Sequence, residues 1–133
     1  VVPKGVRPYE ERGWPSFELA IASLVKDRPL VWDLQYFPEG GVGKAGYKKA
    51  KASCVAGRRP PCSPAAFRAK LKKLQFTNGA DRDFVMDKYL VTFKEAMGSA
   101  EALNFNGLES QDSEAEELAA ALPWCLRLRS LKV

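Results

Sequence analysis

Apolar side chains recur at helical spacing in several stretches of the chain, and this pattern predicts a helix in each of them. Pro15 suits a first helical position, and Ser63 followed by proline is a typical helix cap. Gly98 is expected to end the longest helix. The predicted helices cover residues 15–26, 47–56, 64–74 and 81–97.

Three of these helices have an apolar face that we expect to lie against the core, while residues 47–56 are predicted to form a short basic helix. In the first, this face comprises Phe17, Leu19, Ala20, Ile21, Leu24 and Val25. In the third, it comprises Ala66, Phe67, Ala69, Leu71 and Leu74. In the longest, it comprises Phe84, Val85, Tyr89, Phe93 and Met97.

A short apolar run at residues 30–34 predicts a buried strand, because it contains Val31 and Trp32 and is too short for a helix. A helix followed by such a strand is typical of an α/β layer. Residues 37–46 are rich in glycine and predict a loop. The predicted fold class is therefore α/β or α+β, and rich in helix.

Two segments near the C-terminus share one pattern at a fixed distance. Residues 100–105 and 128–133 both carry apolar side chains at their first, fourth and sixth positions, so that Leu103 corresponds to Leu131, 28 residues later. Between them, residues 112–122 predict a helix with Ala115, Leu118, Ala119 and Leu122 on its apolar face. A fixed period with this spacing is the mark of a leucine-rich repeat. We therefore expect two adjacent parallel strands joined by a helix.

This pattern resembles the ribonuclease-inhibitor class of leucine-rich repeats, whose units are long and contain a true helix. The resemblance covers residues 100–133, and it implies the edge of a repeat array with a protein-binding surface. Leu108 departs from it, because the family commonly has Asn or Cys at that position. The alternative is a generic strand–helix–strand unit without further repeats.

Two further blocks resemble a large uncharacterised group of dinoflagellate-type protist proteins. The first block reads Arg-Gly-Trp-Pro-Ser-Phe-Glu at residues 12–18, and the second reads Phe-Thr-Asn-Gly-Ala-Asp-Arg-Asp at residues 76–83. In that group an R-G-W-P-x-F-E block precedes an F-T-N-G-x-D-x-D block, often with leucine-rich repeats after them. The resemblance implies an architecture and no known activity.

Trp14 and Glu18 also stand in an order similar to the W-C-x-x-E block of Toll/interleukin-1-receptor-like domains, with Pro15 in place of the cysteine. In catalytic members of that family the glutamate serves NAD cleavage, so the chain could be the C-terminal part of such a signalling or NAD-cleaving domain. The structural alternative is that Trp14 packs in the core and Glu18 stabilises the first turn of its helix.

The positive charge is concentrated in one part of the sequence. The formal net charge is +5, and residues 41–80 contain ten lysines or arginines and no Asp or Glu. A phosphate-binding surface for RNA or another polyanion is one interpretation. A solvated surface, or one that docks on the acidic C-terminal region, is the other. The binding candidates are Arg58, Arg59, Lys70, Lys72 and Lys73.

The composition narrows the possible chemistry. The chain has no histidine, which excludes Ser-His-Asp and Cys-His catalysis within it and removes the commonest metal ligand. Its cysteines, Cys54, Cys62 and Cys125, have no metal-binding spacing and are expected to be free thiols in a reducing compartment. We expect no metal, no cofactor and no complete catalytic constellation.

These patterns together predict residues 1–98 as an α/β or helical region and residues 99–133 as the first unit of a leucine-rich repeat. Val1 is not a methionine and the last residues lie inside an apolar pattern, so we expect a fragment of a longer protein. The expected function is protein–protein interaction or scaffolding through the repeat surface. We expect an intracellular, cytoplasmic protein without a membrane span, because its apolar runs are short.

Overall fold

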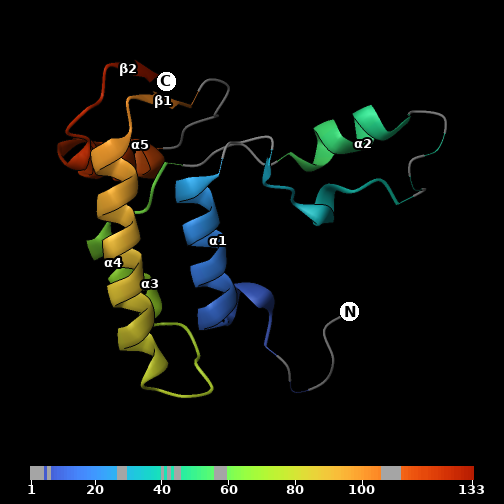
Figure 1. Cartoon of the computed structure of the whole chain (residues 1–133). Helices are drawn as coiled ribbons and strands as arrows, with labels where there is room; N and C mark the ends of the chain where they lie inside the picture. Colours follow the sequence, from blue (N-terminus) through green and yellow to red (C-terminus); the bar gives the residue numbers. More distant parts are fainter. Residues whose placement is uncertain are drawn as a thin grey trace.

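Figure 1 shows a computed structural model of the chain, in which helices dominate and a small parallel sheet lies near the C-terminus. It describes residues 5, 7–26, 30–39, 41, 43, 46–55, 60–105 and 112–133. The helices are α1 (Gly13–Val25), α2 (Gly46–Cys54), α3 (Pro64–Leu71), α4 (Asp81–Ser99) and α5 (Asp112–Ala121). The strands are β1 (Ala102–Asn104) and β2 (Ser130–Lys132). Short 3₁₀ helices are η1 (Tyr9–Glu11), η3 (Leu34–Tyr36) and η4 (Leu122–Trp124).

The main core forms around α4, against which α1 and α3 pack (Figure 1). Val85, Tyr89, Phe93 and Met97 recur along one side of this helix, and all are buried as predicted. Phe84 was expected on the same face, but it is 53% exposed. Phe84 precedes Phe93 by nine residues, which is about two and a half helical turns, so the two side chains lie on nearly opposite sides of α4.

The apolar face of α1 is narrower than predicted. Leu24 is buried, and Ala20 and Ile21 pack partly buried against the core, whereas Leu19 and Val25 are exposed. α1 contacts the core mainly through α4, so only a stripe of its surface is covered. An exposed aliphatic side chain on either side of that stripe is ordinary for a surface helix.

The helix ends predicted from the sequence agree with the structure at the start of α3 and differ from it at the start of α1 and the end of α4. α3 begins as predicted, and the Ser63 hydroxyl accepts a hydrogen bond from the Ala66 backbone N–H at 3.2 Å. α1 already begins at Gly13, so Pro15 is not its first residue. α4 continues past Gly98, because this glycine does not adopt the positive φ that would end a helix.

The strand predicted at residues 30–34 is wrong. The segment forms a single bridge between Trp32 and Val55, and the Asp33 N–H donates to the Cys54 carbonyl at 2.6 Å, before the chain turns into η3. The backbone next to this segment is the end of α2, and a helix end cannot provide the ladder of hydrogen bonds that a strand requires. This half of the chain therefore contains no α/β layer among its described residues.

α2 is the basic helix that the sequence predicted, and it packs on the same segment. The Trp32 ring lies 5.8 Å from that of Tyr47, and the Lys51 ammonium lies 5.7 Å from the Trp32 ring centre. Figure 1 shows α2 extending away from the helical bundle.

The two strands pair in parallel, as predicted. Leu103 is the register partner of Leu131, and Asn104 is that of Lys132, which reproduces the spacing of 28 residues read from the sequence. The Phe105 N–H continues the ladder by donating to the Lys132 carbonyl at 2.7 Å. α5 lies between the strands in the chain and covers one face of their sheet.

The buried face of α5 is rotated from the prediction. Leu118 and Ala121 are buried and Leu122 is half-buried, whereas Ala115 and Ala119 are exposed. The rotation arises because α5 packs against two cores at once. Leu118 contacts the sheet, while Ala121 belongs to the core of the helical bundle.

Candidate functional site

The sheet of β1 and β2 has one covered face and one open face. Leu103 and Phe105 are buried against Leu118 of α5. Successive side chains of a strand point to opposite faces, so the alternate positions lie on the side away from α5. These positions are Ala102, Asn104, Ser130 and Lys132, and all four are exposed. We call this side of the sheet the open face.

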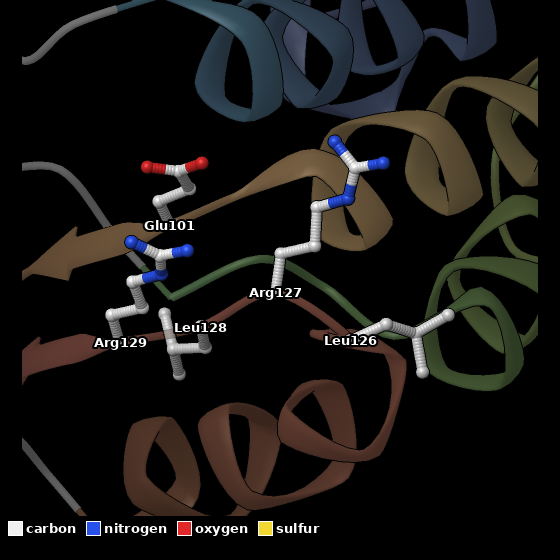
Figure 2. Close-up of a pocket in the computed structure, with 5 residues that line it drawn as sticks. All are labelled: Glu101, Leu126, Arg127, Leu128 and Arg129. Carbon is white, nitrogen blue, oxygen red and sulfur yellow. The ribbon is translucent and has the colours of Figure 1, made fainter.

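An open depression of about 450 Å³ adjoins the open face. It is lined by Glu101, Leu126, Arg127, Leu128 and Arg129. Figure 2 shows the side chains of Glu101, Arg127 and Arg129, from the segments just before the two strands, extending on the side away from α5. The depression therefore presents charged groups to solvent above a partly apolar floor.

The backbone that carries the two arginines is anchored at both ends. The Glu101 carbonyl accepts hydrogen bonds from the N–H groups of Arg129 and Ser130, at 2.8 and 3.1 Å. At the other end, the Cys125 N–H donates to the Leu122 carbonyl at 2.9 Å, and the Cys125 sulfur lies 3.9 Å from that of Met97. The turn between β2 and η4 is thus tied to β1 and to the bundle.

These residues were not among the candidates that the sequence suggested. Arg127 and Arg129 lie on either side of Leu128, the first apolar position of the second repeat-like segment. This alternation of charged and apolar residues was the signal in the sequence that could have identified them. What the sequence could not supply is their proximity to Glu101, because that depends on the parallel pairing of β1 with β2.

The two blocks that carry the resemblance to protist proteins lie against each other. The Gly13 N–H donates to the Gln75 carbonyl at 2.8 Å, and the Gln75 N–H donates to the Glu11 carbonyl at 3.0 Å. The Trp14 indole N–H donates to the Asp81 carboxylate at 2.9 Å. Segments far apart in the sequence are therefore joined by backbone and side-chain hydrogen bonds.

Gly13 occupies a position with no room for a side chain. A Cβ at this residue would lie 2.1 to 2.4 Å from the Phe76 ring, far inside van der Waals contact. Phe76 also stacks under the Arg82 guanidinium, whose carbon lies 5.7 Å from the ring centre. The Phe76 ring of the second block therefore occupies the space that a side chain at Gly13 of the first block would need.

Trp14 and Glu18 lie one helical turn apart on α1, as their spacing implied. Trp14 is 37% exposed, and its ring packs near those of Phe17 and Phe84, at 6.0 and 6.3 Å. Glu18 is exposed and lies in the second turn, because α1 begins at Gly13. It was expected in the first turn, where the helix dipole favours an anion most, and that expectation is wrong. The contacts of Trp14 are those of a residue that joins α1 to α4.

The basic stretch is divided between two places. Arg58 and Arg59 lie outside the described residues, as does Lys44. Lys70, Lys72 and Lys73 are exposed at the end of α3, while the other described lysines of this stretch belong to α2, which Figure 1 shows apart from α3. The run of cations in the sequence therefore does not fold into one continuous helix face.

Carboxylates from α4 approach the α3 part of this stretch. A second open depression, of about 360 Å³, is lined by Arg68 and Lys72 on one side and by Arg82, Asp83 and Asp87 on the other, with Leu71 and Met86 between them. The Arg82 Nη2 donates to the Leu74 carbonyl at 3.4 Å, and its Nε is buried without a hydrogen-bond partner in the described structure. Mixed charge of this kind weakens the attraction for a polyanion.

All three cysteines are free thiols, as expected. Burial and, to a smaller extent, the charge of nearby Glu117 raise the pKa of the Cys62 thiol to about 11, while Lys70 acts in the opposite direction. Burial likewise raises the pKa of Cys125 and of Tyr89. The Tyr89 hydroxyl donates to the Cys62 carbonyl at 2.5 Å. These groups stay protonated at neutral pH, which makes the thiols poor nucleophiles.

Within the described ranges, no group of three or more His, Cys, Asp or Glu residues is placed to hold a metal ion. None of the helices in the same ranges is long and apolar enough to cross a membrane. Leu108, the departure from the repeat pattern, lies outside the described residues.

Comparison with known proteins found no similar protein: no family model matches the chain, and neither a curated protein nor a solved structure matches it significantly.

Proposed function

We propose that this chain is a protein-binding scaffold module, in which β1, α5 and β2 form one unit of a leucine-rich repeat and the open face of their sheet receives a partner protein. The observation that carries the proposal is that Leu103 pairs with Leu131 across the two parallel strands. The two paired residues are separated by one sequence period of 28 residues. A repeat requires equivalent residues of successive units to lie side by side.

The packing of the unit supports the same proposal. Leu103, Phe105 and Leu118 form a small core of their own, with Leu128 partly buried beside it. In a solenoid, each unit buries its strand and helix residues against one another and leaves an apolar end for its neighbour. Leu131 is 39% exposed and Val133 is 81% exposed, which agrees with such an end.

The repeat can be tested by extending it. A second copy of residues 106–133, appended after Val133, would place another equivalent of Leu131 one period further on. If the unit is a repeat, the added copy buries Leu131 and raises both the helix content and the free energy of unfolding. The control carries Asp at the appended equivalents of Leu118 and Leu131. An appended copy that stays unfolded, or that stabilises no more than the control, contradicts the repeat.

The binding surface can be tested separately by selecting ligands from a random peptide library on the immobilised protein. The variant Ser130→Trp blocks the open face, while Ala119→Trp adds the same bulk at an exposed position of α5. We expect the selected peptides to lose binding to the first variant and to keep it with the second. Selection that yields no ligand sensitive to Ser130→Trp contradicts binding at the open face.

A further inference from the structure

We propose that the open face binds an acidic peptide segment, whose carboxylates pair with Arg127 and Arg129. This inference rests on the proposed function, and it adds the chemistry of the partner. It is carried by the juxtaposition of two anchored arginines and an exposed lysine on one side of the sheet.

The charge of this surface is the first step. Arg127, Arg129 and Lys132 are exposed, and their side chains form no ion pair within the described part of the chain. Glu101 is the one carboxylate that lines the adjoining depression. A guanidinium has a planar fork of donors that matches a carboxylate, so two adjacent arginines favour a partner with carboxylates.

The placement of the arginines is the second step. Hydrogen bonds to the Glu101 carbonyl hold the backbone of Arg129, and the contacts of Cys125 hold the opposite end of the turn. A binding residue on an anchored backbone loses less conformational freedom when it captures a ligand. The site thus differs from the lysines beyond the end of α3, which lie on a turn at the helix terminus.

The proposed function favours a peptide over a nucleic acid, since it places a partner protein on the open face. The free edge of β2 is not part of this site, because a further repeat unit would pair with it, and Leu131 and Val133 form the apolar end for that unit. Guanidinium groups pair with phosphates as well as with carboxylates, so an RNA probe in the test separates the two.

A second copy of this chain is a poorer occupant of the open face. If two open faces met, each would present two arginines and a lysine against a single carboxylate, Glu101, so like charges would oppose the pairing. The other described acidic residues of this unit lie on α5, on the far side of the sheet. An acidic segment from another protein meets no such repulsion.

The test uses fluorescence anisotropy with labelled probes and the intact chain. The probes are a short peptide of alternating Glu and Val, its Lys and Val counterpart, and a single-stranded RNA. The double variant Arg127→Gln/Arg129→Gln removes the proposed carboxylate partners. The matched control, Arg68→Gln/Lys70→Gln, removes the same charge from α3, where both side chains are also exposed.

We expect the Glu and Val peptide to bind, the Lys and Val peptide not to bind, and the double variant to weaken binding by about tenfold or more. The control should bind within about twofold of the parent, since it leaves the open face intact. Equal binding by parent and double variant, or no binding of the acidic peptide, would overturn the inference.

Two other outcomes also count against it. RNA that binds more tightly and displaces the peptide would assign the arginines to phosphates. Concentration-dependent self-association of the parent, lost in the double variant, would make a second copy the occupant. Library ligands that Ser130→Trp blocks but that carry no acidic residues would leave the proposed function standing while refuting the acidic partner.

Discussion

The helical bundle and the C-terminal sheet unit use the same apolar side chains but enclose them to different degrees. In the bundle, Tyr89 and Phe93 are completely shielded from solvent, and the Tyr89 ring stacks on Phe67 at 3.9 Å. In the sheet unit, one face is covered and the other is open, and Leu126 is 83% exposed. The bundle is arranged for stability, while the sheet unit leaves backbone and side chains available for contact.

α5 connects these two regions, and it does so within one helical turn. Leu118 packs on the sheet and Ala121 packs in the bundle core, so neither core is independent of this helix. The sheet unit is therefore held in place by the bundle, although its own core is small. An open surface on a rigid support keeps its geometry without being buried.

The largest expected effect is in the bundle. Phe93→Ala should lower the free energy of unfolding by about 3–5 kcal/mol, because the ring is fully buried and contacts Tyr89 and Trp124. Urea denaturation followed by circular dichroism measures this loss. Val91→Ala on the same helix, at a position that is 53% exposed, should change stability by less than about 0.5 kcal/mol. Similar losses in both variants would mean that α4 has no buried side.

The next effect is in the sheet unit and should be local. Leu118→Ala should cost about 2–3 kcal/mol, since the side chain is 9% exposed and few neighbours surround it. Amide hydrogen exchange should accelerate in β1 and β2 more than in the centre of α4, because regions of a protein can open separately. Ala119→Ser, at an exposed neighbour, is the control. Uniform acceleration along the chain would show that the two regions unfold as one.

A smaller effect is expected where the two sequence blocks meet. Gly13→Ala should cost about 1–3 kcal/mol, because its Cβ would overlap the Phe76 ring. Gly79→Ala provides the control, since nothing lies within 4 Å of a Cβ there. Adding Phe76→Leu to Gly13→Ala should recover part of the loss, as thermal unfolding would reveal. Two losses that simply add would show that the ring and the glycine are not in contact.

The smallest effect concerns pH. The unfolded chain loses the Cys62 proton near pH 9.0, whereas the folded protein keeps it until about pH 11. Between these values the unfolded state binds fewer protons, so stability should fall as the pH rises. Burial of Tyr89 acts in the same direction. Chemical denaturation across this window, compared with Cys62→Ala, measures the contribution of the thiol. An identical pH dependence in both proteins would contradict it.

The sequence by itself determined the elements whose pattern is local. Ser63 and the following proline specified the start of α3, and the four-residue spacing of Val85, Tyr89, Phe93 and Met97 specified the buried side of α4. The period that relates Leu103 to Leu131 even specified which strand residues pair. Each of these features depends on neighbours within a few turns, or on a repeat of one pattern.

Tertiary structure decided the rest, because the partners lie far apart in the chain. The run at residues 30–34 has the composition of a strand, but the end of α2 offers it a single bridge. The buried face of α5 differs from the predicted face because the helix packs against two cores, and its own sequence pattern does not reveal this. The arginines of the open face became a candidate site only when parallel pairing brought Glu101 beside them, since a surface exists only once distant segments have met.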